Sequence, residues 1–325
     1  MQDTVETKPP AGEPAVAPPR AAPRRPGTPA WRRVARALAP VPWLAPAIVL
    51  IAVVVLWPVW EMFTTSREHI DSNGFDLGSY GWKNYGNLFQ DPLLGSIMTR
   101  TLVWVVAIVS LTVILSLAMA QLFNQSFPGR KIVRWALIAP WAASVMMTSI
   151  VFRWMLDPNN GVINVLLHQL GLVKAFNGPQ ASWLGNPTDA MYWMIGVAVF
   201  VSIPFTTYAL LAGLATIPGE VYEAARVDGA GKWRTYRSIT LPLLRPALTV
   251  AVLINLMNVF NSFPIIFTMT SGGPDYQTST STVYMYALKG FNIGESGALS
   301  VVNFGVVIII VAIFLRVNKS NLKAG

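Results

Sequence analysis

The polar residues best suited to bind a ligand lie inside a long apolar run, residues 247–270. Asn255, Asn258 and Ser262 follow the i, i+3, i+7 spacing that places side chains on one face of a helix, and Asn261 lies on its flank. Because an amide both donates and accepts hydrogen bonds, this face could bind an uncharged ligand that carries several hydroxyl groups. The alternative is that the three amides join this helix to helices of a second subunit, and the residues themselves leave both interpretations open.

Residues typical of catalytic or metal sites are scarce. The chain has no Cys, which excludes disulfides, thiolate metal sites and Cys nucleophiles, and its two His are far apart in the sequence. Its only Gly-Lys pair, at position 231, is followed by Trp233 and lacks the preceding glycine of a nucleotide-binding loop. We therefore expect no enzyme activity, no metal site and no cofactor bound by this chain.

The composition indicates where the polar residues must lie. Hydrophobic residues make up 53% of the 325 residues and charged residues 12%, with a mean hydropathy of +0.48. Each of several apolar runs reaches the length, about 20 residues, that a helix needs to cross a bilayer. These runs are residues 42–64, 98–122, 134–156, 190–214, 247–270 and 297–316. The sequence thus predicts an all-α polytopic protein of the cell membrane with six transmembrane helices.

The chain has a net charge of +9, and the distribution of its basic residues predicts how it is oriented in the membrane. Eighteen Lys and Arg residues lie in the two tails and in the second-to-third and fourth-to-fifth connections, against six on the other side. The positive-inside rule then places both termini in the cytoplasm, so we expect contact with membrane lipid and none with nucleic acid. Residues 1–38 are rich in Pro, Ala and Arg and are predicted to form a disordered cytoplasmic tail before the transmembrane region 39–318.

The connection 215–246 has the pattern of two short helices. Glu223 falls in an early turn of the first, where the helix dipole favours an anion. Gly229 and Gly231 are expected to form a turn that needs permissive backbone angles, and Pro242 is expected to end the second, basic helix. The sequence predicts a helix–turn–helix hairpin along the membrane surface.

This hairpin resembles the EAA loop of ABC-importer permeases, although a surface hairpin without a partner is the simpler alternative. The matching positions are Glu223-Ala224-Ala225, Gly229, Ile239 and Leu241-Pro242. The resemblance implies the type I ABC-importer permease fold and a chain that forms half of a pore. It also implies four kinds of partner: a second permease subunit, a dimer of ATPase subunits that bind ATP and Mg, an external solute-binding protein and a transported solute. Coupling to the ATPase would fall on Glu223, Ala224, Ala225, Asp228, Gly229 and Gly231.

A second segment narrows the resemblance to carbohydrate importers. Thr270-Ser271-Gly272-Gly273-Pro274 is similar to the TxGGP segment of the F-type half of maltose permeases, and the likeness extends over residues 40–318. It implies a di- or oligosaccharide substrate. The implied substrate pathway consists of Ser202, Phe205, Asn255, Asn258, Val259, Asn261 and Ser262. Val259 and Ala198 stand where the maltose permease has amides, so we expect a ligand other than maltose.

A six-span secondary transporter of a polar solute is the alternative function. Such a carrier needs an acidic residue or His within the membrane to couple ions, whereas Glu61 and Glu295 lie only at the edges of the predicted spans. Arg153, at the outer end of the third span, either extends to the membrane surface or takes part in a gate.

Overall fold

The computed structural model describes residues 41–171 and 182–318, so the predicted tail 1–38 lies outside the described residues. The chain divides into two compact units, residues 1–57 and 58–325. The described part of the first unit contains α2 (Val41–Ile51) and a π-helical turn, η1 (Ala52–Leu56). The next helix, α3 (Trp57–Thr65), begins at the junction, where Trp57 donates its backbone N–H to the carbonyl oxygen of Ala52.

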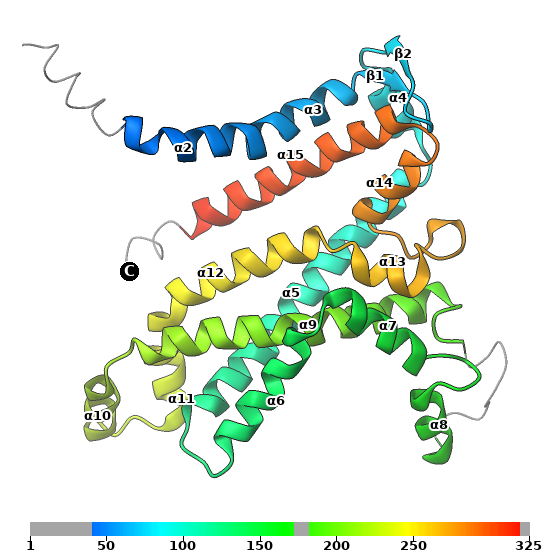
Figure 1. Ribbon diagram of the computed structural model, residues 1–325. Helices are drawn as coiled ribbons and strands as arrows, with labels where there is room; N and C mark the ends of the chain where they lie inside the picture. Colours follow the sequence, from blue (N-terminus) through cyan, green and yellow to red (C-terminus); the bar gives the residue numbers. More distant parts are fainter. Residues whose placement is uncertain (1–40, 172–181, 319–325) are drawn as a thin grey trace, which may run out of the picture. The chain divides into compact units, whose positions relative to one another are not determined.

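The second unit is built around long helices that pack side by side (Figure 1). The helix α5 (Leu94–Asn124) packs along α9 (Pro187–Ala215) and α12 (Leu241–Phe260), and α15 (Ile293–Val317) contacts α12. The N-terminus of α9 is well defined because Asn186 caps it and Pro187 occupies a position that needs no N–H donor. Five helical stretches of the described residues are long and apolar enough to cross a membrane.

The third predicted span is wrong as a single helix. Residues 134–156 fall instead into α6 (Arg130–Ala142) and α7 (Val145–Met155), separated by Ala143 and Ser144. Both separating residues have extended backbone angles, and the Ser144 hydroxyl accepts the backbone N–H of Met147 at 3.4 Å. Serine is a preferred N-terminal cap because its oxygen satisfies a free N–H group of the new helix. The apolar run therefore contains a helix start that hydropathy alone did not reveal.

The fifth predicted span is also wrong as a single helix. Residues 247–270 contain most of α12, a gap at Asn261–Phe263, and α13 (Pro264–Thr270). Pro264 stands at the first position of α13, where its missing N–H leaves no bond unmade.

Pro242, by contrast, does not end its helix, which corrects the prediction. The helix α11 (Lys232–Thr235) continues through a π-helical turn, η3 (Tyr236–Thr240), directly into α12. Leu241 donates its N–H to the carbonyl oxygen of Tyr236, five residues earlier. This wider turn shifts the hydrogen-bond register just before the proline, and the chain passes it without a break.

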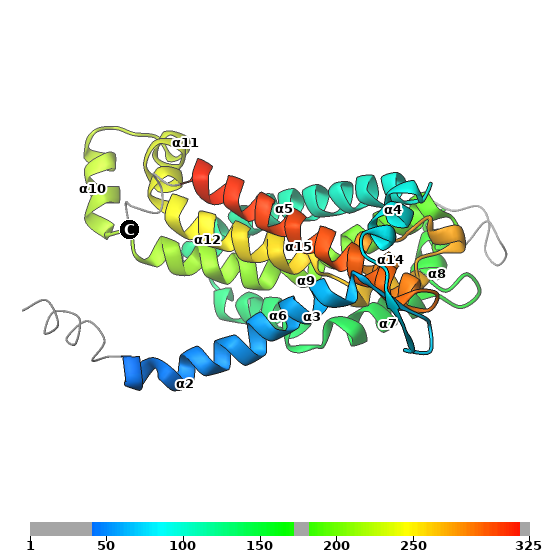
Figure 2. The same cartoon turned by 90° about the horizontal axis from the view of Figure 1, so that it is seen from above.

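Shorter elements cluster at one end of the long helices (Figure 2). They are α4 (Lys83–Gln90), α8 (Val162–Gln169), η4 (Pro274–Tyr276), α14 (Ser281–Lys289) and an antiparallel hairpin of β1 (Glu68–Ile70) and β2 (Asp76–Ser79). The buried Asn84 of α4 donates to the carbonyl oxygens of Ser66 and Glu68, at 3.0 and 2.9 Å. The chain is mostly helical, and this small hairpin is the exception that the all-α prediction missed.

Candidate functional site

The predicted coupling hairpin is present and lies at the opposite end of the long helices from β1–β2 and α14 (Figures 1 and 2). Its first helix is α10 (Gly219–Val227), which begins directly after Pro218 and has Glu220 in its first turn. Glu223 and Ala224 are exposed, whereas Ala225 is buried, with 4% of its surface exposed. The helix thus presents a carboxylate beside a small side chain, which leaves room for close contact with another protein.

The turn after α10 is held by its own backbone. Ala230 donates its N–H to the carbonyl oxygen of Ala225 at 2.9 Å, across Gly229, which has a φ of +74°. This arrangement is the usual glycine-terminated helix end, and side chains rarely tolerate that φ. Gly231 is different, because its φ of −66° suits any residue. The prediction that both glycines need unusual backbone angles is therefore right for Gly229 and wrong for Gly231.

The residues predicted to form the substrate pathway meet in one cavity of about 590 Å³. All seven line it: Ser202, Phe205, Asn255, Asn258, Val259, Asn261 and Ser262. Ala198 lines it as well, and none of the described residues around the cavity carries a charge. The structure therefore brings these residues together, while their contact with a substrate stays a prediction.

Both helix interruptions open onto this cavity. Ala143 and Ser144, between α6 and α7, line one part of it, and Asn261 and Ser262, between α12 and α13, line another. Backbone groups at a helix interruption lack their regular partners, so they need a polar or watery surrounding. Sequence reasoning missed both interruptions, although Ser144 and Pro264 are the residue types that start helices.

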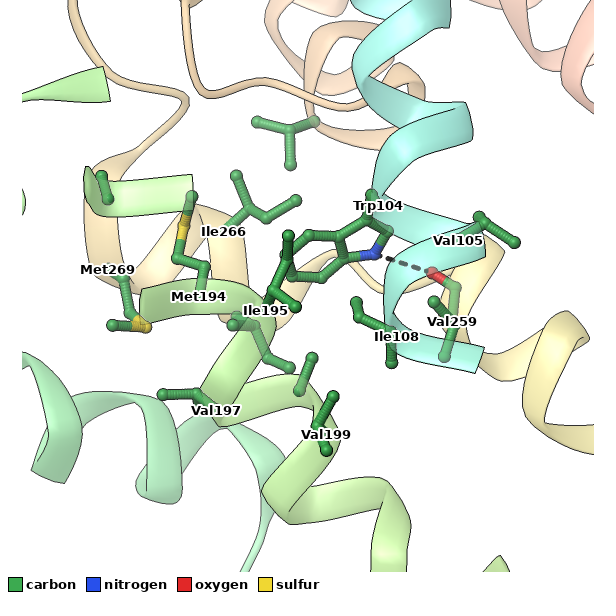
Figure 3. Packing of buried hydrophobic residues seen from close by; sticks show 14 of the residues in the cluster. Trp104, Val105, Ile108, Met194, Ile195, Val197, Val199, Val259, Ile266 and Met269 are labelled. Carbon is green, nitrogen blue, oxygen red and sulfur yellow. Dashed lines mark hydrogen bonds between the residues drawn. The ribbon is translucent and has the colours of Figure 1, made fainter. Parts of the chain in front are cut away.

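Sequence reasoning also missed Trp104 of α5, which lines the cavity and packs among buried hydrophobic residues (Figure 3). Its side chain is 1% exposed, and its indole Nε1 donates to the backbone oxygen of Val259 at 3.2 Å. The two residues are 155 positions apart, and Val259 lies in the last turn of α12. Trp104 thus joins α5 to the end of α12, beside the cavity.

The asparagines differ in their hydrogen bonds. Asn255 is buried, and its Nδ2 has no hydrogen-bond partner among the described residues. Asn261 donates to the carbonyl oxygen of Met257 in its own helix at 2.9 Å. Within the described part of the chain, the side chains of Asn255, Asn258 and Asn261 thus form no hydrogen bond to another helix. The alternative role, hydrogen bonds to helices of a second subunit, stays a prediction.

Arg153 forms a hydrogen bond that neither of its two expected roles predicted. Its Nη1 donates to the carbonyl oxygen of Thr268 at 2.9 Å, and this contact joins α7 to α13. These are the two helices that follow the interruptions, and they pack against each other.

At the end of the long helices opposite the hairpin, two side chains form a hydrogen bond. The Tyr284 hydroxyl of α14 bonds to a carboxylate oxygen of Asp91, which lies between α4 and α5. Burial, followed by this bond, raises the pKa of Tyr284, so the phenol keeps its proton. Among residues 41–171 and 182–318, no group of three or more His, Cys, Asp or Glu could hold a metal ion.

Comparison with known proteins gives a consistent result. A family model described as a binding-protein-dependent transport system inner membrane component matches residues 112–319. A probable ABC transporter permease protein of Brucella suis is 35% identical over 85% of this chain and 94% of the relative. A sulfoquinovosyl glycerol transport system permease protein of Agrobacterium fabrum is 31% identical over 89% of this chain and 93% of its own length. A trehalose/maltose transport system permease protein of Thermococcus litoralis is 29% identical over 85% and 92%.

A solved structure shares the fold. It is a chain of a bacterial ABC transporter involved in the import of the acidic polysaccharide alginate, with a TM-score of 0.73. The match covers 89% of this chain and 98% of that chain at 22% sequence identity, so it supports the fold alone. Together with the family match over residues 112–319, this shows that the chain is a multi-pass membrane protein that belongs to the family of binding-protein-dependent transport system inner membrane components.

Proposed function

We propose that the chain is one permease subunit of an ATP-driven, binding-protein-dependent importer, and that its substrate is a neutral di- or oligosaccharide. The observation that carries this proposal is the cavity lined by amides, hydroxyls and Phe205, without a charged side chain among its described residues. Amides and hydroxyls match the hydrogen bonds of sugar hydroxyl groups, and an aromatic ring offers an apolar face to the sugar ring.

The names of relatives support a carbohydrate. One relative is named for trehalose and maltose and another for sulfoquinovosyl glycerol. Because a charged substrate group would need a cation, the uncharged lining of this chain's cavity favours a neutral sugar.

The assembly follows from the positions of the hairpin and of the loops. We infer that the hairpin and both termini lie in the cytoplasm, where an ATPase dimer binds ATP and Mg and contacts Glu223. The solute-binding protein would then bind at the opposite end, near β1–β2 and α14, and a second permease subunit would complete the pore. A solved structure of the alginate transporter is in complex with a periplasmic protein, which supports a binding protein as one of the partners.

The helix after the hairpin supplies a mechanical link. From Lys232 to Phe260 the chain is helical without a gap, through the π-helical turn η3. The far part of this stretch carries Asn255, Asn258 and Val259, which line the cavity. A displacement of the hairpin when the ATPase dimer closes would therefore reach the cavity directly and turn its opening from one side of the membrane to the other.

The test is uptake by vesicles that contain the complete complex and its binding protein. The ligand of the binding protein is first identified with a panel of neutral and anionic sugars. We expect uptake of a neutral di- or oligosaccharide that requires ATP, stops with vanadate and persists with a protonophore. Uptake that vanadate does not inhibit and that the protonophore abolishes would contradict the proposal and favour a secondary transporter. Family membership does not favour that alternative.

A further inference from the structure

A second hollow lies away from the cavity, between α5 and the segment α11–η3. We call it the α5–α11 groove; its volume is about 700 Å³. Its α5 wall contains Ile114, Leu117 and Leu122, and its other wall contains Lys232, Trp233 and Tyr236. Ile114 and Leu122 are 63% and 50% exposed, so the groove presents an uncovered apolar surface along one helix.

The lengths of the helices place the groove at the edge of the bilayer. With 31 residues, α5 is about 46 Å long, more than the hydrocarbon core of about 30 Å, so an end of α5 reaches the headgroups. The next helix after α11–η3, α12, has 20 residues and is long enough to cross the core by itself. From these lengths we place the segment α11–η3 at headgroup level, with the apolar part of the groove running along α5 beside the acyl chains.

The charges gather at the headgroup end. Lys232 lines the groove and is exposed. Arg130 donates from Nη1 to the carbonyl oxygen of Gln125, a groove residue, at 3.3 Å, which places a second cation there. No acidic residue is among the described residues that line the groove.

Two aromatic side chains mark the same level. Trp233 is 72% exposed, and its ring centroid lies 6.0 Å from that of Tyr236. Trp and Tyr rings favour the region between acyl chains and headgroups because they combine an apolar body with a polar group. An apolar channel that ends at two cations and two interfacial rings has the chemistry of a phospholipid site.

We propose that the α5–α11 groove binds an anionic phospholipid, with an acyl chain along Ile114 and Leu117 and the phosphate at Lys232 and Arg130. The N-terminal residues 1–40 are an unsuitable occupant, because they contain seven basic and three acidic residues and would be repelled by the same cations. Since one wall of the groove leads directly into α12, the bound lipid would stabilise the start of that helix. The proposal concerns lipid binding and does not depend on the transported solute.

The test uses the complete complex in nanodiscs that contain equal amounts of phosphatidylglycerol and phosphatidylcholine. Native mass spectrometry measures which lipid stays bound, and a photoactivatable phosphatidylglycerol locates the site by cross-linking. We expect preferential retention of phosphatidylglycerol and cross-links to residues 114–125 and 232–236. Lys232→Glu should lower the retained phosphatidylglycerol by at least about fivefold, because each cation near the surface contributes to anionic lipid binding.

Matched variants separate the site from the general surface charge. Arg316→Glu changes the charge equally at the end of α15, outside the groove, and should change retention less than about twofold. Ala118→Trp fills the groove from an exposed position and should remove the bound lipid, whereas Leu115→Trp, on the same helix but outside the groove, should not. Lys232→Gln gives a milder change should the reversal of charge impair folding.

Three results would overturn the proposal. The first is equal retention of the two lipids by the parent protein. The second is an equal loss in Lys232→Glu and Arg316→Glu. The third is cross-linking from the groove to a polypeptide of the complex, which would make the groove a protein interface.

Discussion

The predicted coupling hairpin and the cavity are built in opposite ways. The hairpin's six predicted residues lie within residues 223–231, and its turn is held by backbone bonds between neighbours such as Ala225 and Ala230. The cavity combines residues from α5, α9 and two interrupted helices, and it depends on contacts such as the one between Trp104 and Val259. A change in the hairpin should therefore act through a partner protein, whereas a change at the cavity should also act on the stability of this chain.

The largest effect should come from Glu223→Ala. Because Glu223 is exposed and no described residue forms an ion pair with it, its loss should leave insertion and thermal stability unchanged. A buried charge pair with the ATPase is worth about 2–5 kcal/mol when one partner is removed, so uptake and sugar-stimulated ATP hydrolysis should fall at least about tenfold. Both are measured in reconstituted vesicles. Glu220→Ala, on the same helix, is the control and should keep most of the activity, and normal uptake by Glu223→Ala would refute the coupling role.

The next prediction tests whether the cavity depends on contacts between residues that are far apart in the sequence. Trp104→Phe removes the indole N–H that reaches Val259 and leaves a smaller ring in the buried position. The lost hydrogen bond and packing should destabilise the protein by about 1–3 kcal/mol. The midpoint of thermal unfolding of the purified protein measures this, with Trp135→Phe as control because Trp135 is 72% exposed. Equal midpoints for both variants would mean that the α5–α12 contact contributes nothing.

These two regions also show how far the sequence could predict the structure. Gly229 was predicted because a glycine after a helix-forming run reports directly on its own backbone. The prediction that Pro242 ends its helix was wrong, because the effect of a proline depends on the hydrogen-bond register of the preceding turn. The residue types do not reveal the π-helical turn that changes this register. Seven cavity residues were found by helical spacing and resemblance. Trp104 was not, since an apolar helix with a Trp gives no sign of a partner 155 residues away.

A smaller effect should separate the asparagines of the cavity. Asn258→Ala removes an exposed amide, and Asn255→Ala removes a buried amide whose Nδ2 lacks a partner among the described residues. If both amides contact the sugar, each lost hydrogen bond should weaken binding by about 1 kcal/mol, or roughly fivefold. The apparent affinity for the identified sugar in vesicle uptake measures this, and the ATP hydrolysis without sugar serves as control. An unchanged affinity in both variants would return these residues to a structural role.

The most local effect compares the two glycines of the hairpin. An added Cβ meets nothing within 4 Å at either glycine, so space does not distinguish them. Their backbones do, because Gly229 has a φ of +74° and Gly231 a φ of −66°. Gly229→Ala should therefore loosen the end of α10 by about 1 kcal/mol, and Gly231→Ala should have almost no effect. Hydrogen exchange of the Ala230 backbone amide, which donates to the Ala225 carbonyl oxygen, measures the difference. If Gly229→Ala strains the turn, this amide should exchange faster in Gly229→Ala and at the parent rate in Gly231→Ala. Equal exchange in both variants would show that the turn is held by contacts other than its own backbone geometry.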